Sequence, residues 1–236
     1  MSKLEQRIIK LRANLAKWIQ PDNQRTVDKY ELSLREWLIY HQKEIIFSQV
    51  SWMGVKTQRH VLDNWIYQEI LYEVQPDIVV EIGSFRGGST LYLAHLMDII
   101  GKGSVLSVDI DRQHFQVSHD RISTVTGDSQ SSDIIAQVAE LTKNKSTLVI
   151  HDGNHEKEHV LKDLMAYSEF VTVGSYLIVE DGIVDIMGVD FEWYHQGGPV
   201  AATEAFLVQN KNFEIDEKRE RYLLTYNPKG YLKRIK

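Results

Sequence analysis

The sequence contains no cysteine among its 236 residues. Disulfide bonds and thiolate metal sites are therefore excluded. No stretch holds 18 consecutive apolar residues, which argues against a membrane-spanning helix. The first residues also lack the uninterrupted apolar core of a secretory signal. Together these absences predict a cytoplasmic protein.

Basic character is also scarce. The formal net charge is -6, and no basic stripe runs through the chain, so nucleic-acid binding is not expected. The basic C-terminal segment Lys229–Lys236 is interpreted as a solvated end. What remains, 43% hydrophobic and 25% charged residues, is typical of a globular protein, and the expected partner is a small molecule.

Two parts of the chain differ in pattern. Residues 1 to about 20 place apolar side chains on one helical face, which suits either packing on the chain's own domain or a subunit interface. A homo-oligomer is predicted on this basis. Helical patterns also cover Asp28–Tyr40 and Gln58–Glu73. We therefore expect a helical extension and substrate cap over 1–75 and a catalytic domain over 76–236.

From Pro76 onward, strand patterns alternate with helical ones. This alternation predicts an α/β fold with a doubly wound, mostly parallel, seven-stranded Rossmann-like sheet. The expected strands are Ile78–Ile82, Ser104–Asp109, Ile122–Thr126, Thr147–His151, Tyr176–Glu180, Phe213–Ile215 and Tyr222–Tyr226. The expected helices are Ser89–Ile100, His155–Ser168 and Val200–Gln209.

The segment Asp77–Ser89, DIVVEIGSFRGGS, predicts a strand, a glycine-rich turn and the start of a helix. Glycines let backbone N–H groups approach a ligand, and the helix N-terminus attracts an anionic group. The turn lacks the Gly-x-Gly-x-x-Gly spacing of dinucleotide folds and the Gly-Lys-Ser/Thr of a phosphate loop. An acid before a loose glycine turn instead suits S-adenosylmethionine (SAM), which carries both cationic groups and a carboxylate.

Further cofactor contacts are expected after the next two strands. Asp109, or failing it Asp111, is placed to bind the ribose hydroxyls, and the segment 127–130, Gly-Asp-Ser-Gln, to meet the adenine edge. A turn or helix-cap role is the alternative for each residue taken singly. The predicted cofactor-binding residues are Glu81, Gly83, Ser84, Gly88, Ser89, Asp109, Asp128 and Ser129.

Acids also follow the fourth and fifth expected strands. Asp152, Glu180 and Asp181 would meet if these strands are neighbours, and three hard oxygen donors favour Mg²⁺ or another hard divalent cation. Such a cation lowers the pKa of a bound hydroxyl. His155 is then the predicted general base, because its usual pKa lies near working pH. The alternative for His155 is a surface histidine at the start of a helix.

Two other chemistries compete for these residues. His155–His159 spells His-Glu-x-x-His, the zinc metallopeptidase pattern, but it begins directly after a strand and turn rather than inside a long helix. A second alternative is a metal-dependent hydroxylase with Fe(II) held by His151, Asp152, His155 and His159. A third is a SAM-binding or scaffold subunit without activity.

Taken together, these residues resemble class I SAM-dependent O-methyltransferases, and more closely the cephalosporin hydroxylase and rhamnosyl O-methyltransferase family. The resemblance rests on Trp52-x-Gly54, EIGSFRGGS, VDID ending at Asp111, HDGNH at 151–155, IVEDG at 178–182, the Gly197–Pro199 turn and TYNPKGYLKR at 225–234. It implies Mg²⁺-dependent methylation of a hydroxyl on a sugar, antibiotic or other natural product. By position it makes Asp152, Glu180 and Asp181 the metal ligands and His155 the base, where catechol enzymes have a lysine.

The acceptor is not specified by these patterns. Its pocket is expected to use the segment around Trp52 and the loop Ile183–Gly198. The aromatic and histidine side chains of that loop, which suit a sugar ring or a polyketide equally, are Phe191, Trp193, Tyr194 and His195.

Overall fold

The computed structural model describes residues 32–187 and 197–236. The helix expected over the first residues and the loop residues Phe191, Trp193, Tyr194 and His195 lie outside this range. The chain divides into two compact units, Met1–Gln49 and Val50–Lys236. Residues 50–75, which the sequence pattern assigns to the extension, therefore belong with the sheet. Their role as a substrate cap stays a prediction.

The described part of the first unit is helical. Its elements are α2 (Leu34–Tyr40), the π-helix η2 (His41–Ile46) and α3 (Phe47–Gln49). Ser33 and Glu36 begin α2 with a capping box, in which each side chain bonds to the other residue's backbone N–H group. This reciprocal bonding satisfies the N–H groups at the start of α2, and the predicted start of a helix at Asp28 lies outside the described residues.

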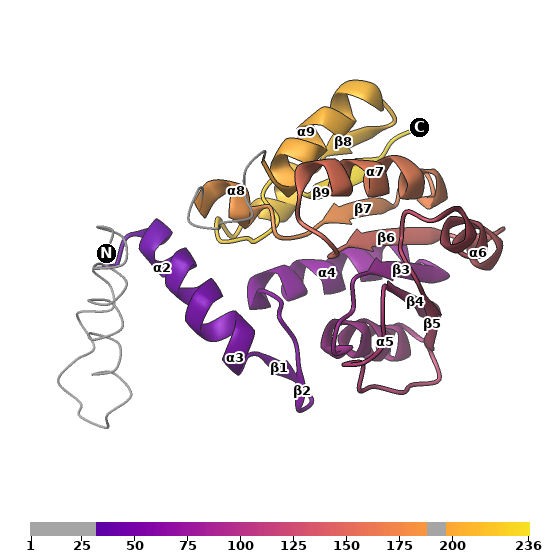
Figure 1. Cartoon of the computed structure of the whole chain (residues 1–236), viewed down its shortest axis with the longest axis horizontal. Helices are drawn as coiled ribbons and strands as arrows, with labels where there is room; N and C mark the ends of the chain where they lie inside the picture. The colour runs from indigo at the N-terminus through magenta and orange to yellow at the C-terminus, as the bar shows by residue number, and fades with distance from the viewer. Residues whose placement is uncertain (1–31, 188–196) are drawn as a thin grey trace. The chain divides into compact units, whose positions relative to one another are not determined.

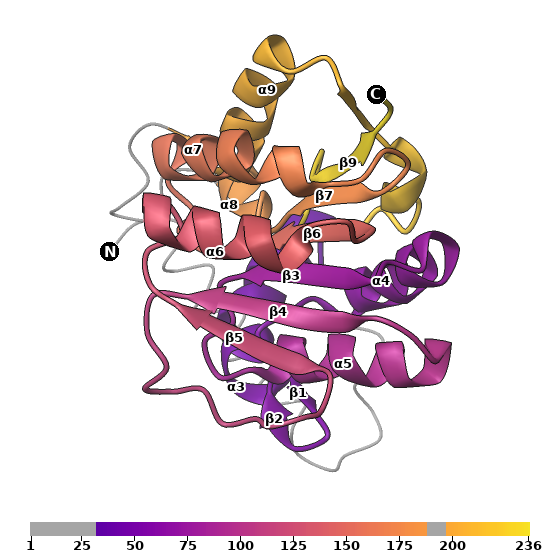
Figure 2. The same ribbon diagram turned by 90° about the vertical axis from the view of Figure 1, so that its right-hand side faces the viewer.

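The second unit contains a seven-stranded sheet in the order β5-β4-β3-β6-β7-β9-β8 (Figure 2). The strands are β3 (Ile78–Ile82), β4 (Ser104–Asp109), β5 (Ile122–Thr126), β6 (Thr147–His151), β7 (Tyr176–Val179), β8 (Phe213–Ile215) and β9 (Tyr231–Arg234). The first five are parallel, and β9 runs antiparallel between β7 and β8. The predicted doubly wound, mostly parallel sheet is confirmed. A separate hairpin pairs β1 (Ser51–Trp52) with β2 (Val55–Lys56).

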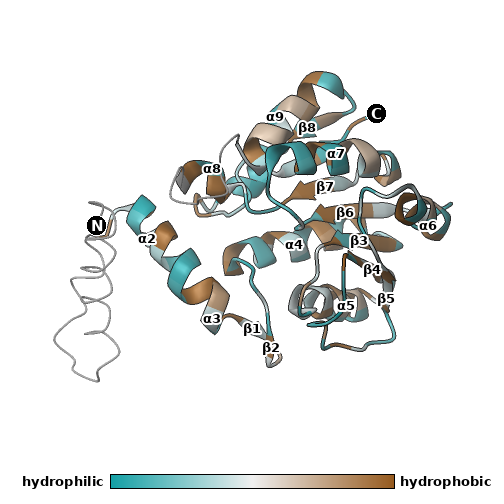
Figure 3. Cartoon of the chain, viewed as in Figure 1, coloured by the Kyte–Doolittle hydropathy of each residue, from teal (hydrophilic) through white to brown (hydrophobic). Residues whose placement is uncertain are grey.

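Helices cover both faces of the sheet. They are α4 (Val61–Val74), α5 (Gly88–Ile100), α6 (Ser132–Thr142), α7 (Lys157–Tyr167) and α9 (Pro199–Gln209), with the short helices η3 (Ser168–Phe170), α8 (Ile183–Met187) and η4 (Glu217–Glu220). One core packs α6, α7 and α9 on the sheet, and the other packs α4 and α5 (Figure 1). The central strands are mostly apolar (Figure 3), as expected of strands that are buried on both faces, although β3 carries Glu81 and β6 ends in His151. No helix of the described residues is long and apolar enough to cross a membrane.

Two sequence-based expectations differ from the structure. The strand predicted at Tyr222–Tyr226 is wrong, and the last strand is β9 instead. The reason is Asp63 of α4, whose carboxylate accepts bonds from the Thr225 hydroxyl (2.6 Å) and the Tyr226 N–H group (2.8 Å), so a buried acid holds this segment outside the ladder. The helix α6 was not predicted, although Ser131 caps its N-terminus by accepting from the Ile134 N–H group.

Candidate functional site

The site lies at the carboxyl ends of β3 and β6, where the strand order reverses. Chain order runs outward from β3 to β4 and β5 on one side and to β6 and β7 on the other. Gly83 follows β3 with φ +83°, and a Cβ placed there would lie 2.0 Å from the Asp152 carbonyl oxygen after β6. Only glycine fits at this position. The two segments meet at the point where ligands collect in open α/β sheets.

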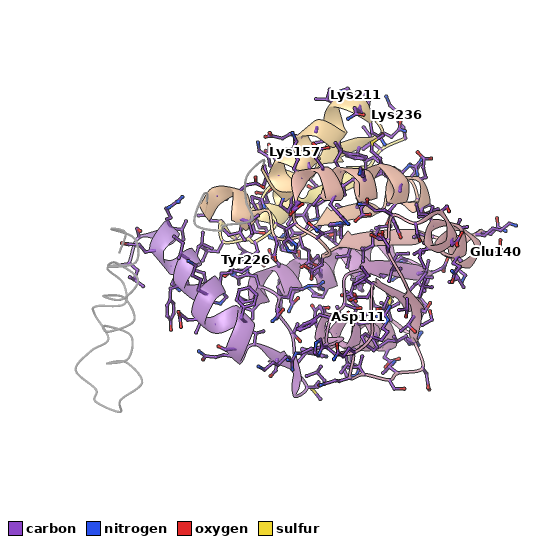
Figure 4. The ribbon with its side chains drawn as sticks, in the orientation of Figure 1. Asp111, Glu140, Lys157, Lys211, Tyr226 and Lys236 are labelled. Carbon is purple, nitrogen blue, oxygen red and sulfur yellow. The ribbon has the colours of Figure 1, made fainter. Side chains whose placement is uncertain are left out.

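Asp109 at the end of β4 organises the glycine turn. Its Oδ2 atom accepts bonds from the Ser84 N–H group (2.8 Å), the Phe85 N–H group (2.8 Å) and the Ser84 hydroxyl (3.2 Å). Burial alone would raise the pKa of Asp109, but these donors outweigh it and lower the pKa. Asp111, marked in Figure 4, is exposed and accepts a bond from the Gln113 N–H group. Asp109 therefore remains an ionised acid at the turn.

Gly88 and Ser89 form the first turn of α5 and are buried. A Cβ on Gly88 would lie 2.2 Å from the Lys56 carbonyl oxygen and 2.3 Å from the Thr57 hydroxyl oxygen. The segment that follows the β1–β2 hairpin thus runs directly against the helix start. This contact is what leads Arg59, two residues farther along, into the site.

The loop after β5 is anchored to α7 through Asp163. The Ser129 hydroxyl donates to Asp163 Oδ1 (3.0 Å), and the Gln130 side-chain amide donates to the His159 carbonyl (3.0 Å). His151 Nε2 lies 2.9 Å from Asp163 Oδ2. The Asp163 side chain is fully buried. The sequence pattern did not single out Asp163, although a lone acid on the apolar face of the predicted helix was an available signal.

Glu81 is fully buried beneath the glycine turn. One carboxylate oxygen accepts the Thr90 hydroxyl of α5, and the other accepts from Arg59 Nη2 at 3.3 Å. Both oxygens thus have partners within the protein, and direct contact with a cofactor would require these bonds to change.

Three potential metal ligands converge beside Gly83. One ligand atom each from Asp152, His155 and Asp181 lies within 4.8 Å of the other two. His155 Nε2 is 2.8 Å from Asp181 Oδ2. Burial opposes the imidazolium, but the hydrogen bond and charge of Asp181 and the charge of Asp152 outweigh it and raise the pKa of His155 to about 9. Burial, and next the charge of Asp181, raise the pKa of Asp152 to about 7. We call these residues the open cluster.

Asp181 is held in position by the C-terminal segment. Its backbone is left-handed, with φ +56°, and its N–H group donates to the Asn227 side-chain carbonyl at 3.2 Å. The Asn227 amide donates in turn to the Tyr67 hydroxyl of α4 (2.9 Å). Tyr226, labelled in Figure 4, begins this turn. The TYNPKGY motif therefore supports the acid at the end of β7.

Glu180, the third predicted metal ligand, lies outside the open cluster. Arg59 Nη2 is 2.5 Å from Glu180 Oε1, and Arg59 Nε donates to Oε2 at 3.1 Å. Burial raises the pKa of Glu180 well above its usual range, although Arg59 opposes this. We call Arg59, Glu81 and Glu180 the closed cluster. Sequence reasoning missed Arg59, yet it had recognised that the acids at this edge need a cation.

The histidines proposed for the alternative chemistries do not share one site, because His151 and His159 contact Asp163 whereas His155 contacts Asp181. α7 begins at Lys157, so His155 precedes the helix, and His159 Nδ1 lies 3.3 Å from Asp163 rather than beside His155 and Asp181. His151 also faces Asp163. Among the described residues, neither histidine belongs to the potential metal cluster. The peptidase and hydroxylase interpretations are therefore not favoured.

Comparison with known proteins identifies the family. The model of the rhamnosyl O-methyltransferase/CmcI family matches residues 44–235. The chain belongs to this family. Rhamnosyl O-methyltransferase of Mycobacterium leprae (strain TN) is 32% identical over 200 residues, which cover 82% of this chain and 86% of that protein. Rhamnosyl O-methyltransferase of Mycobacterium tuberculosis (strain ATCC 25618 / H37Rv) is 32% identical over 201 residues, covering 82% and 81%. The expected family and enzyme class, O-methyltransferase, are confirmed.

Solved structures of the family share the fold. A CmcI structure with Mg and SAM superposes with a TM-score of 0.63 at 21% identity, covering 80% of this chain and 78% of that one. A CmcI structure with SAH gives a TM-score of 0.57 at 18% identity, covering 80% and 83%. These superpositions show that the chain shares the fold of the CmcI structures.

Proposed function

We propose that this family member transfers a methyl group from SAM to a hydroxyl of a small molecule and uses a divalent cation, Mg²⁺, to do so. The observation that carries the proposal is the convergence of Asp152, His155 and Asp181 beside the Gly83 turn. A hard-cation site and a glycine-rich turn thus share one sheet edge. Support also comes from the relatives, which are O-methyltransferases, and from the CmcI structure with Mg and SAM.

The cofactor side of the site is formed by the turn after β3 and the loops after β4 and β5. The turn residues Gly83 and Ser84 and the helix start at Gly88 and Ser89 would lie along the amino-acid part of SAM, because this turn opens a helix N-terminus. The residues that would bind the ribose and adenine are Asp109, Asp128 and Ser129. Glu81 would act from beneath the turn, through Thr90 and Arg59.

The cation would be held by Asp152 and Asp181, with Glu180 as the further predicted ligand. The oxygen donors fit a hard divalent ion, and Glu180 would have to loosen its contact with Arg59 to join them. When bound, the cation supplies positive charge that lowers the pKa of a nearby hydroxyl. His155 would receive the acceptor proton at Nε2, the atom that now faces Asp181. The pKa of about 9 keeps this imidazole protonated at neutral pH, so it would act as a base only when a bound cation offsets the negative charges of Asp152 and Asp181 that raise its pKa.

The acceptor class proposed here is a sugar hydroxyl. The support for this class is that the curated relatives are named for rhamnosyl groups, because the aromatic side chains of the predicted acceptor pocket suit a sugar ring or a polyketide equally. Natural products that carry deoxysugars are therefore the first compounds to test. Self-association through the N-terminal segment also stays a prediction.

Calorimetry with SAM, in the presence and absence of Mg²⁺, tests the cofactor part. Methyl transfer from radiolabelled SAM to a panel of rhamnosides and other glycosides tests the activity. We expect micromolar SAM binding and transfer that stops with EDTA and returns with Mg²⁺. Absence of SAM binding would reject the assignment, and tight binding without transfer to any alcohol would indicate a non-catalytic SAM-binding subunit.

A further inference from the structure

Arg59 is the only arginine of the described residues that pairs with acids from three strands of the sheet. Its guanidinium contacts Glu81 of β3 and Glu180 after β7, and its Nη2 atom lies 3.7 Å from Asp152 Oδ2 after β6. The side chain is 2% exposed and stacks over the Tyr67 ring at 4.9 Å. A single buried cation therefore touches both the closed cluster and the open cluster.

The guanidinium of Arg59 is incompletely bonded. Arg59 Nη1 is buried and finds no acceptor among the described residues, although Nη2 lies 2.5 Å from Glu180 Oε1. Buried donors are normally satisfied. Arg59 is therefore not locked into place at every donor, and its main partner, Glu180, is adjacent to Asp181 of the open cluster.

We propose that Arg59 is a positioning residue that sets how tightly the site holds its divalent cation, because it competes with that cation for the Glu180 carboxylate. This inference rests on the proposed function. The guanidinium neutralises Glu180 while no cation is bound, and its charge beside Asp152 opposes the arrival of a second positive charge. This competition weakens cation binding. In the metal-free protein it also stabilises the buried acids, because Arg59 pairs with them.

The test is a Mn²⁺ titration of the full chain without SAM, followed by electron paramagnetic resonance of the free ion. In Arg59→Gln the Glu180 carboxylate is released and a positive charge is lost, so we expect Mn²⁺ to bind about tenfold tighter or more. Arg59→Lys keeps the charge but cannot form the two-pronged contact, so we expect a gain of roughly threefold. Unchanged or weaker Mn²⁺ binding in both variants would overturn the inference.

A double variant separates competition for Glu180 from a general effect of charge. We expect the gain of Arg59→Gln to disappear when Glu180→Gln is added, leaving an affinity within about threefold of Glu180→Gln alone. A gain that persists in full would overturn the competition. If Arg59→Gln fails to fold by circular dichroism, Arg59→Lys alone decides the question.

Arg219 provides the matched control. It is also a buried arginine paired with acids, Asp216 at 3.2 Å and Glu73, but it lies against Tyr176 at the opposite end of β7. Arg219→Lys should lower thermal stability and leave Mn²⁺ affinity unchanged. If the wild-type chain and every variant bind no Mn²⁺, the metal part of the proposed function fails. If the wild-type chain binds and Arg59 variants do not tighten, only this inference fails.

Discussion

The two acid clusters at the sheet edge solve the same electrostatic problem in different ways. In the closed cluster, Glu81 and Glu180 are matched by a protein cation, Arg59, and are almost fully buried. In the open cluster, Asp152 and Asp181 lie close together beside His155, Arg59 approaches Asp152 only to 3.7 Å, and the two acidic side chains are 23% and 24% exposed. A buried charge must be paired within the protein, whereas a partly exposed charge is solvated by water until a ligand binds.

This difference teaches which acids stabilise the fold and which are available for chemistry. Removing an acid from the closed cluster takes one of its partners from the buried Arg59, so stability falls. Removing one from the open cluster relieves repulsion between neighbouring carboxylates, so stability in the absence of metal rises while cation binding is lost. Each of the following variants tests this contrast.

The largest effect is expected for Glu81→Ala. Thr90 and Arg59 both lose an acceptor in a fully buried position, and the free energy of unfolding should fall by about 3 kcal/mol or more. Urea denaturation followed by circular dichroism measures it. Glu140→Ala, which removes an exposed acid on α6, is the control and should change stability by less than about 0.5 kcal/mol. Equal stability of Glu81→Ala and wild type would contradict the role of the closed cluster.

Asp163→Ala tests whether another buried, fully paired acid, the one that anchors the loop after β5, also stabilises the fold. Ser129 and His151 would lose their acceptor, and we expect a loss of roughly 1–3 kcal/mol in the free energy of unfolding. SAM binding, measured by calorimetry, should weaken because the loop loses its anchor. Glu158→Ala on the exposed side of the same helix is the control. Unchanged SAM affinity would show that Asp163 serves stability alone.

Asp152→Asn should act in the opposite direction. Burial and the charge of Asp181 disfavour the ionised carboxylate, so in EDTA at pH 8 the free energy of unfolding should rise by about 1 kcal/mol. Mn²⁺ affinity should fall at least about tenfold, because a ligand is lost. Asp120→Asn, an exposed acid after β4, is the control. A lower free energy of unfolding for Asp152→Asn in the absence of metal would contradict the distinction between the open and closed clusters.

Asp77→Asn should give the smallest change in the free energy of unfolding. It compares the two buried or half-buried acid clusters with an acid on the protein surface. The N–H group and hydroxyl of Ser146, with Lys102, lower the pKa of Asp77 to about 2. Because its folded-state pKa lies below the unfolded value, Asp77 stabilises the protein above about pH 4, and this contribution disappears as the pH falls toward 2. The side chain is 46% exposed, so the difference at pH 7 should be below about 1 kcal/mol.

Chemical denaturation of Asp77→Asn and wild type between pH 7 and pH 3 measures this difference. We expect the two stability curves to approach each other as the pH falls. Curves that stay parallel across this range would show that the carboxylate charge of Asp77 makes no contribution.

The strands were predictable because of their composition. Runs such as Ile78–Ile82 and Thr147–His151 are mostly apolar, as expected of parallel strands covered on both faces, and their predicted bounds are confirmed. The prediction of the last strand was wrong for a physical reason. Tyr222–Tyr226 has a strand-like composition, but the Asp63 carboxylate, far away in sequence, binds its backbone instead.

The sequence by itself determined the family, the sheet and the identity of the acids that end the strands, because apolar runs and glycine turns are local patterns. Only the tertiary structure decided which acids share a cation. Arg59 reaches Glu81 and Glu180 from a segment packed against the start of α5, and Asp181 takes its place through Asn227. Such pairings depend on contacts between residues distant in the chain, and no local pattern encodes them.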